Sequence, residues 1–247
     1  MSGMGKAIGI VGGVGPFAGT DLVNKVFTHT RANKDQDHIS LFLTSCPSII
    51  PDRTEYLLSG GEDPAPGIER CINWLAGCGA SAVGIACNTA HAPEILSRVR
   101  IPEGVVLVNM IEQTANHVAE LVKGRSDFNV GLLATLGTLR CNVYDKYFQS
   151  IVKPDQDVAE SVHAAIYDKQ YGIKALSSVS DKARAAVCAA VDHLRQKGCS
   201  AVILGCTELP LVFSGKHSYK DVELVDPTEI LAIELIRATE PGKLLCN

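Results

Sequence analysis

Two stretches of this chain repeat one another at a nearly constant spacing. Residues 79–87 read GASAVGIAC and residues 198–206 read GCSAVILGC, so that five of nine positions are identical. The cysteines that end them, Cys87 and Cys206, lie 119 residues apart. Each copy is a short apolar run, typical of a buried strand with a cysteine at its carboxyl-terminal tip. Such a chain is predicted to fold as two similar halves that each present one thiol.

The repeat extends beyond the cysteines. Residues 8–15 resemble residues 130–137, and residues 107–112 resemble residues 224–229, at offsets of 122 and 117. A helical pattern precedes each cysteine strand and ends near Gly77 or Gly198, where a helix stop is expected. Coincidence among small apolar residues is the alternative, and three matched blocks in the same order argue against it.

Apolar runs that alternate with amphipathic segments predict α/β units around mainly parallel sheets. We predict two pseudo-symmetric three-layer α/β domains, with helices on both faces of each sheet. Residues 1–113 form the N-terminal domain and residues 114–225 the C-terminal domain, while the segment 226–247 packs back on the first. Ligands bind at the carboxyl ends of strands in such sheets, so the site is expected in the interdomain cleft. The predicted strands are residues 7–11, 39–43, 82–86, 105–108, 130–133, 201–204 and 222–225.

Composition excludes several classes of protein. The net charge of −4 is spread without a Lys/Arg cluster, which argues against a nucleic-acid or anionic-membrane surface. Residues 1–5 lead directly into an apolar run without a signal sequence, and no stretch is long enough to span a bilayer, so we expect a cytoplasmic protein. Nine cysteines without paired C-x-x-C spacing indicate reduced thiols and no metal site.

Both repeated cysteines are followed by residues that favour a helix start. Asn88 or Thr89 is expected to cap the first helix, and Thr207 the second, with Pro210 in its first turn. Unpaired amides and the dipole at a helix N-terminus lower the pKa of a thiol. Both thiols are therefore expected to ionise near neutral pH, where each can act as acid or base.

Other charged side chains near these motifs have two interpretations each. His91 and Glu208, at corresponding helix starts, could orient the thiols or relay protons, or could satisfy local backbone groups. Arg53, on an expected loop, could clamp a carboxylate through two hydrogen bonds or could be a solvated surface residue. A lysine within residues 167–175 could bind a second carboxylate, form a Schiff base with pyridoxal phosphate, or lie on the surface.

The glycine-rich turn after the first predicted strand admits two readings. Gly13, Gly15 and Ala18 formally satisfy the G-x-G-x-x-G/A pattern of dinucleotide-binding proteins. A tight turn that lets the backbone approach the site is at least as good an explanation. The matching residues 134–138 carry hydroxyls in place of glycines, which suits a carboxylate better than a pyrophosphate.

Taken in order, these motifs are similar to those of a known family. The chain resembles the cofactor-independent aspartate/glutamate racemases, in particular the aspartate racemase branch. Any single motif is weak evidence, whereas the ordered set, which spans most of the chain, is specific. The motifs are GGVGP (residues 12–16), PDRT (51–54), CNTAH (87–91), GIK (172–174) and GCTEL (205–209).

The resemblance implies an isomerase that acts on a small amino acid without cofactor or metal, and a homodimer. It implies that Cys87 and Cys206 are the catalytic acid/base pair, and that Arg53 and a lysine bind the distal carboxylate. Lys174 fits that lysine best, and Lys169 remains open. The other residues expected to bind substrate are Asn88, Thr89, Thr138 and Thr207 around the α-carboxylate and amine, with Gly13 and Glu208.

Specificity is predicted from a departure within the family. Glutamate racemases typically carry Asp-Ser-Gly after the first strand and histidine after the second Cys-Thr. Residues 12–14 and Glu208 replace these here, which favours aspartate while leaving glutamate or broader specificity open. Three rival hypotheses are an NAD-dependent reductase, a nonenzymatic amino-acid-binding protein and a redox protein with a Cys87–Cys206 disulfide.

Overall fold

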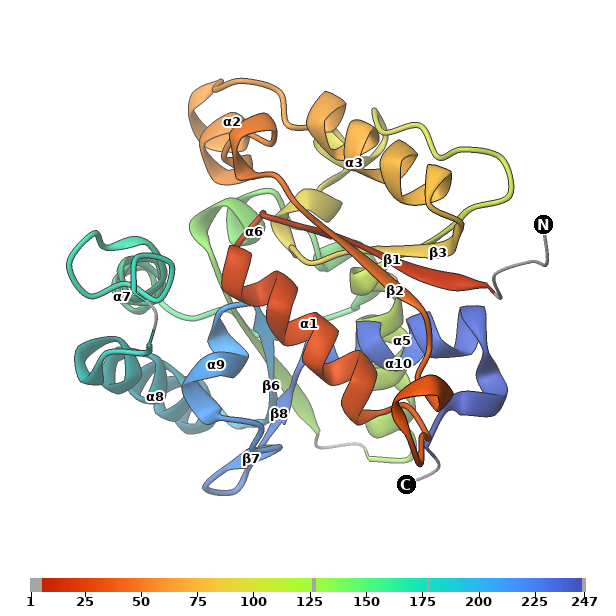
Figure 1. Ribbon diagram of the computed structural model, residues 1–247. Helices are drawn as coiled ribbons and strands as arrows, with labels where there is room; N and C mark the ends of the chain where they lie inside the picture. The colour runs from red at the N-terminus through yellow and green to blue at the C-terminus, as the bar shows by residue number, and fades with distance from the viewer. Residues whose placement is uncertain (1–5, 126–127, 177, 246–247) are drawn as a thin grey trace.

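A computed structural model describes residues 6–125, 128–176 and 178–245 (Figure 1). The expected absence of a signal sequence rests partly on residues 1–5, which lie outside the described residues. Within this range the chain forms two four-stranded sheets, with strand orders β2-β1-β3-β4 and β5-β6-β8-β7. We call the parts built on these sheets the first half and the second half. All strand pairs are parallel except β7–β8.

Each predicted apolar run forms a strand. The short β7 was not predicted, because two residues provide no alternating pattern to detect. The strands are β1 (Ala7–Gly12), β2 (Leu41–Ser45), β3 (Ala80–Ile85), β4 (Val106–Val108), β5 (Asn129–Ala134), β6 (Cys199–Gly205), β7 (Ser218–Tyr219) and β8 (Val222–Val225). The α-helices are α1 (Pro16–Thr28), α2 (Arg53–Ser59), α3 (Ala65–Gly77), α4 (Pro93–Leu96), α5 (Met110–Leu121), α6 (Leu136–Arg140), α7 (Gln156–Tyr167), α8 (Asp181–Gln196), α9 (Leu209–Phe213) and α10 (Pro227–Thr239).

The sequence repeat corresponds to a structural repeat. The pairing of β1 with β3 shifts register between Ala7 and Ile8, and the pairing of β5 with β6 shifts between Asn129 and Val130. Helices α5 and α10 begin alike, since the side chains of Asn109 and Asp226 each accept two backbone N–H bonds. The fold class is therefore two similar α/β units, as the sequence predicts.

The repeat is incomplete at the sheet edges. In the first half, β2 pairs along its whole length with β1. At the equivalent edge of the second half, Val152 alone forms a parallel bridge, by accepting from the Leu132 amide and donating to the Val130 carbonyl, each at 2.9 Å. The second half instead extends its opposite edge with β7.

Helices cover both faces of the first sheet. Ile8 and Ile10 of β1 share an apolar cluster with Leu22 of α1 and Leu235 of α10. Val83 of β3 belongs to the cluster on the other face, which includes side chains of α3. Helix α10, which follows the strands of the second half in the sequence, thus packs against the sheet of the first half.

The second sheet is also enclosed. Leu133 and Val202 pack with the side chains of α7 and α8. On the opposite face, Leu132 and Ile203 belong to the cluster that contains Ile111 of α5. Helix α5 therefore joins the cores of the two halves, and the expected boundary between residues 113 and 114 falls inside it.

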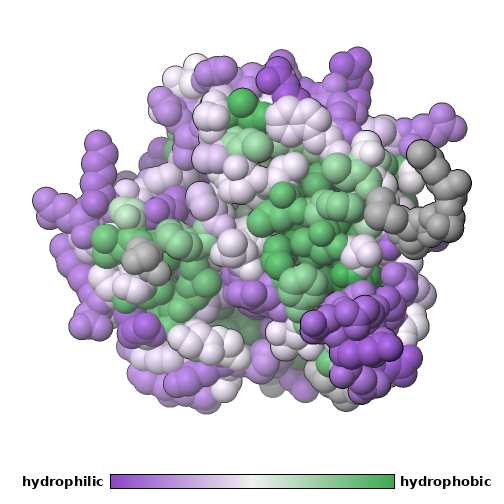
Figure 2. Space-filling view, in the orientation of Figure 1, coloured by the Kyte–Doolittle hydropathy of each residue, from purple (hydrophilic) through white to green (hydrophobic). Residues whose placement is uncertain are grey.

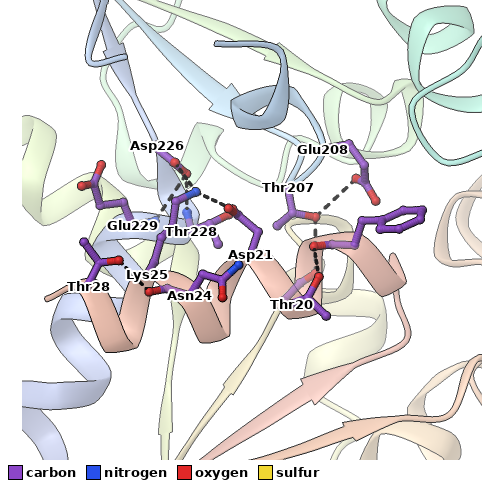
Figure 3. A network of polar contacts seen from close by, with 12 residues as sticks. Thr20, Asp21, Asn24, Lys25, Thr28, Thr207, Glu208, Asp226, Thr228 and Glu229 are labelled. Carbon is purple, nitrogen blue, oxygen red and sulfur yellow. Dashed lines mark hydrogen bonds and ion pairs between the residues drawn. The ribbon is translucent and has the colours of Figure 1, made fainter. Parts of the chain in front are cut away.

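A partly buried ion cluster joins α1 to the start of α10 (Figure 3). The Lys25 ammonium lies 2.6 Å from Oδ2 of Asp226 and also pairs with Asp21. Farther along the same two helices, His29 Nε2 lies 2.9 Å from Oε1 of Glu229. Asp226 both caps α10 and neutralises a lysine of α1, so it fixes the two helices together.

The surface around the edge strand β2 is apolar. Leu41, Phe42 and Leu43 of this strand are only partly buried, and apolar side chains gather in this part of the molecule (Figure 2). Phe17 and Phe27 of the adjacent α1 are exposed. None of the helices in the described residues is long and apolar enough to cross a membrane.

Candidate active site

The two repeated cysteines lie at equivalent ends of equivalent strands. Cys87 follows β3 and Cys206 follows β6, and both are buried with 6% of their surface exposed. The amide of Cys87 donates to the carbonyl of Ile85, and that of Cys206 to the carbonyl of Leu204, each at 2.8 Å. Both side chains are free thiols. The matching backbone bonds show that the repeat gives both cysteines the same local backbone arrangement.

The expected helix caps are wrong on both sides. Neither Asn88 nor Thr89 caps a helix by its side chain, because Cys87 is followed only by a three-residue 3₁₀ turn, Thr89–His91. The residue at the N-cap of α9 is Glu208 rather than Thr207, and its side chain also makes no capping bond. A short helix with these caps offers little dipole, so the expected lowering of both thiol pKa values lacks its basis.

Arg53 is the charged side chain beside Cys87. It is the first residue of α2 rather than part of a loop, since Asp52 accepts from the Glu55 amide and starts the helix there. Its Nη2 donates to the Val14 carbonyl at 2.8 Å and its Nη1 to the Pro51 carbonyl at 3.1 Å.

The guanidinium of Arg53 is only partly satisfied. The residue is 7% exposed, and its Nε is buried without a hydrogen-bond partner among the described residues. Burial lowers its pKa, but the negative forms of Cys87, Asp52 and Tyr167 more than offset this, so the pKa is raised. Arg53 is therefore a permanent cation beside the first thiol, and its Nε–H is available to a bound acceptor.

Asn88 supplies a second free donor. The hydroxyl of the buried Tyr144 donates to Oδ1 of Asn88, which fixes the orientation of the amide. The Nδ2 group of Asn88 is buried and has no partner within the described residues. A buried donor without a partner is costly, and a bound acceptor would remove this cost.

Three hydroxyls connect the two halves next to Cys87. Oγ1 of Thr89 lies 2.9 Å from Oγ1 of Thr138 and 3.3 Å from that of Thr135. Thr135 caps α6 by accepting from the Thr138 amide at 3.3 Å. These hydroxyls can each donate or accept, so the cluster can adapt to either a carboxylate or an amine.

His91 binds backbone groups rather than a thiol. Its Nδ1 lies 2.8 Å from the Cys87 carbonyl, and the Met110 amide donates to its Nε2 at 3.3 Å. These bonds define a neutral tautomer with the proton on Nδ1. Burial lowers the pKa of His91 from 6.5 to about 4. The interpretation as a satisfied core histidine therefore fits the geometry, and the orienting or relay role does not.

Cys206 has a carboxylate as its neighbour. Its thiol donates to Oε2 of Glu208 at 2.9 Å, while the Lys174 ammonium pairs with Oε1 of the same carboxylate. Burial and the charge of Glu208 raise the pKa of Cys206 well above its usual value, which corrects the expectation that both thiols ionise near neutrality. Thr207 donates to the Ala86 carbonyl of the first half at 3.4 Å, a long bond across the halves.

Glu208 is ionised despite complete burial. Burial raises its pKa, but Lys174 and the hydrogen bond from Cys206 lower it, and the net shift is downward. The same ion pair raises the pKa of Lys174. Lys169, the other lysine considered for this site, lies on the exposed side of the segment.

The glycines of the turn after β1 have distinct neighbours. Gly13 has a φ of 73°, and a Cβ there would lie 2.7 Å from the backbone nitrogen of Cys46. Gly15 has a φ of 138°, and a Cβ there would lie 2.2 Å from Oε1 of Glu208 and 3.1 Å from Nζ of Lys174. Gly15 is thus required where the turn passes over the ion pair.

Three residues around the site were not in the predicted set. Thr135 could have been found, because it belongs to the hydroxyl segment that aligns with the glycine turn. Tyr144 orients Asn88 from 56 residues away and carries no local signal. Tyr167 donates to Asp52 at 3.2 Å, and its ring centroid lies 5.6 Å from Nζ of Lys174. Tyr167 therefore contacts both Asp52, which precedes Arg53, and the Lys174 ammonium.

The comparisons with known proteins agree on one family. The sequence profile of the family described as Asp/Glu/Hydantoin racemase matches residues 11–235. The chain is similar to the solved structure of an aspartate racemase from Picrophilus torridus, with 30% identity, a TM-score of 0.81, and coverage of 98% of this chain and 96% of that one. A glutamate racemase structure from Bacillus anthracis, at 19% identity and a TM-score of 0.62, shares the fold over 97% of this chain and 84% of that one.

Curated sequence relatives are mainly glutamate racemases. The protein from Desulforudis audaxviator is 30% identical over 162 residues, which cover 64% of this chain and 56% of the relative. The protein from Pseudomonas aeruginosa strain UCBPP-PA14 is 31% identical over 190 residues, which cover 72% and 65%. The matched part of this chain thus spans less than two thirds of the length of these relatives.

Proposed function

This chain belongs to the Asp/Glu/hydantoin racemase family, and we propose that it interconverts L- and D-aspartate by proton transfer between two cysteines. The observation that carries the proposal is the equivalent placement of two buried thiols, Cys87 and Cys206, beside buried donors that lack protein partners. Racemisation needs an acid and a base on opposite sides of one carbon, and a two-fold repeat provides two such groups.

In the proposed mechanism the thiolate of one cysteine removes the α-proton while the other thiol protonates the opposite face. Arg53 is a cation beside Cys87, whereas the Cys206 thiol donates to the Glu208 carboxylate, and this contact helps to raise the pKa of Cys206. We therefore assign Cys206 as the acid and Cys87 as the base when the enzyme begins a turnover. The opposite enantiomer reacts after the protons have exchanged places.

The substrate anion is held by groups already positioned for it. Nε of Arg53 and Nδ2 of Asn88 are the free donors, and Lys174 supplies a second cation. We propose that Arg53 and Lys174 bind the distal carboxylate. The hydroxyls of Thr89, Thr138 and Thr207, together with Asn88, face the α-carboxylate and amine. Fixed donors in a buried site stabilise developing charge at the α-carbon without reorganisation.

Aspartate is proposed as the substrate because of the structural similarity to an aspartate racemase over nearly the whole chain. Glutamate is the alternative, favoured by the curated sequence relatives, which are mainly glutamate racemases. Both carry a distal carboxylate for Arg53 and Lys174, and they differ by one methylene. One methylene changes specificity by roughly 10- to 200-fold, so a measured ratio distinguishes them.

The test is a cofactor-free assay with the purified protein. L- and D-aspartate, and separately L- and D-glutamate, are followed by circular dichroism, with α-proton exchange in deuterated water as a second readout. We expect racemisation and exchange with aspartate from both enantiomers. Saturable binding without exchange would leave a nonenzymatic amino-acid-binding protein, and faster turnover of glutamate would replace the proposed substrate.

We also propose that the protein is a homodimer, as the family resemblance implies, and that it resides in the cytoplasm, the location expected from its sequence. Sedimentation equilibrium of the purified protein tests the first part. A monomer mass at all concentrations would contradict it.

A further inference from the structure

One carboxylate in the site has two different partners. Oε2 of Glu208 accepts from the Cys206 thiol at 2.9 Å, and Oε1 pairs with the Lys174 ammonium. The single hydroxyl proton of Thr207 can be donated either to Oε2, at 3.3 Å, or to the Ala86 carbonyl, at 3.4 Å. The proton on Cys206 and the charge on Lys174 are therefore linked through a single group.

The carboxylate of Glu208 depends on Lys174 for its charge balance. Glu208 is 2% exposed, and Lys174 is the cation in direct contact with it. A buried carboxylate that loses its cation must either take up a proton or hold neighbouring protons more tightly. Any movement of Lys174 is thus expected to change how strongly the Cys206–Glu208 pair holds its proton.

Lys174 is the accessible member of this group. Its side chain is 21% exposed, in contrast to the 2% of Glu208. Glu208 lies beside Thr207 (Figure 3), and its Oε1 is near the start of α1, since a Cβ on Gly15 would lie 2.2 Å from it. A cavity of about 390 Å³ between α1 and the segment after Lys174 is lined by Phe17, Ile173 and Arg184. Lys174 itself does not line this cavity, and its greater exposure is what makes it, rather than Glu208, the member of the pair that an anion can contact.

We infer that Lys174 is shared between Glu208 and the distal carboxylate of the substrate, so that binding of an acidic substrate strengthens the hold of the Cys206–Glu208 pair on its proton. The inference rests on the proposed function and adds a coupling to it. When the distal carboxylate shares the lysine, the charge of Glu208 is less compensated and Cys206 is kept as the acid. When the product leaves, Lys174 returns to Glu208 and the hold weakens.

This coupling makes the distal carboxylate part of the acid/base chemistry. An amino acid without that group leaves Lys174 on Glu208, so its binding does not change how strongly the pair holds the Cys206 proton. Discrimination against neutral amino acids then arises in the proton-transfer step as well as in binding. Gly15 maintains the arrangement, because any side chain at this position would collide with Oε1 of Glu208.

Proton uptake on ligand binding tests the coupling without turnover. Succinate carries two carboxylates and no α-amine, and butyrate has the same carbon chain with one carboxylate. Each is titrated into the protein by calorimetry at alkaline pH, in two buffers of different ionisation enthalpy. We expect uptake of a fraction of a proton with succinate and none with butyrate.

Amino-acid substitutions test whether the proton taken up binds to the Cys206–Glu208 pair. Glu208→Gln is expected to abolish the proton uptake. Cys206→Ser removes the titrating thiol and is expected to have the same effect, so it replaces Glu208→Gln if that variant does not fold. Lys169→Gln changes an exposed lysine in the same segment and is expected to keep the uptake. The inference would be overturned if succinate failed to bind or bound without proton uptake. It would also be overturned if Glu208→Gln and Cys206→Ser took up as many protons as the wild type.

The pH dependence of turnover provides a second readout. kcat/KM reports groups of the free enzyme, and kcat reports those of the substrate complex. We expect the limb that belongs to the Cys206–Glu208 pair to lie roughly one pH unit higher in kcat than in kcat/KM. If racemisation is observed with coincident limbs and no proton uptake, the coupling alone fails. If succinate drives uptake but aspartate is not racemised, the proposed function alone fails.

Discussion

The surroundings of Cys87 and Cys206 differ although the backbone around them repeats. Both sulfurs follow strands with the same register shift and the same backbone bond at the cysteine. Beside Cys87 lies the guanidinium of Arg53, whereas the neighbour of Cys206 is the carboxylate of Glu208. A duplicated backbone therefore places the two thiols alike, and the substituted neighbours give them opposite electrostatics. In the mechanism that we propose, the repeat provides the two thiols, and its divergence distinguishes the thiol that starts as the base from the one that starts as the acid.

The strongest test of this comparison removes each sulfur in turn. Cys87→Ala and Cys206→Ala should each reduce aspartate racemisation by at least about 10³-fold, because neither half contains another acid/base group in the same position. Circular dichroism measures the rate, and α-proton exchange from each enantiomer shows which face has lost its base. Cys78→Ala, at an exposed thiol, serves as the control and should retain full activity. Full racemisation by either active-site variant would exclude the two-base mechanism.

The next largest expected effect is a loss of folding stability at acid pH that arises from the first half. The residue four positions after Cys87 is His91, and the residue four positions after Cys206 is Pro210, so only the first half carries a buried histidine here. The pKa of His91 is lowered from 6.5 to about 4, so the unfolded chain binds more protons between these values. The free energy of unfolding should therefore fall as the pH decreases from about 6.5 to 4, by up to ~3 kcal/mol.

Urea unfolding at a series of pH values measures this effect. His91→Asn should lower stability at neutral pH, since two backbone hydrogen bonds are disturbed, but should lack this component of the acid dependence. An identical pH dependence in the variant and the wild type would assign the acid sensitivity to other groups.

A substitution that keeps the positive charge beside Cys87 tests whether the arrangement of the Arg53 donors matters. Arg53→Lys retains a cation but loses the planar set of donors, including the free Nε group. We expect kcat/KM for aspartate to fall by about 10²-fold, since one well-placed donor to a developing charge is worth roughly that factor. Arg100→Lys, at an arginine whose side chain is 89% exposed, is the matched control and should change little. Equal effects of the two substitutions would argue against a substrate-binding role for Arg53.

The smallest expected effects lie at the equivalent helix caps. Asn109 caps α5 and Asp226 caps α10, but only Asp226 also pairs with Lys25. Asp226→Asn keeps the cap and removes the charge, so we expect a loss of about 1–2 kcal/mol in the free energy of unfolding. Asn109→Asp should change it by less than ~0.5 kcal/mol. Chemical denaturation compares the two, and equal effects would show that the Lys25 pair contributes little.

Local patterns in the sequence are sufficient for most of the fold. Buried strands are continuous apolar runs, and a repeat at one offset already requires two similar units, so the strands and the placement of both cysteines are predictable. The contacts that determine thiol chemistry are not local. Lys174 reaches Glu208 across 34 residues, and Tyr144 reaches Asn88 across 56. No periodicity or cap rule encodes such contacts, which explains why the electrostatics of Cys206 was mispredicted while its location was not.

The position of α10 has a consequence for the assembly of the chain. This helix covers the face of the first sheet that contains Ile8 and Ile10, although more than 200 residues separate them in the sequence. During synthesis from the N-terminus, α1 can cover part of that apolar face early, but the part that α10 covers stays exposed until residues 227–239 have been made. The first half therefore cannot complete its core alone, and its sheet is fully covered only after α10 has packed onto it.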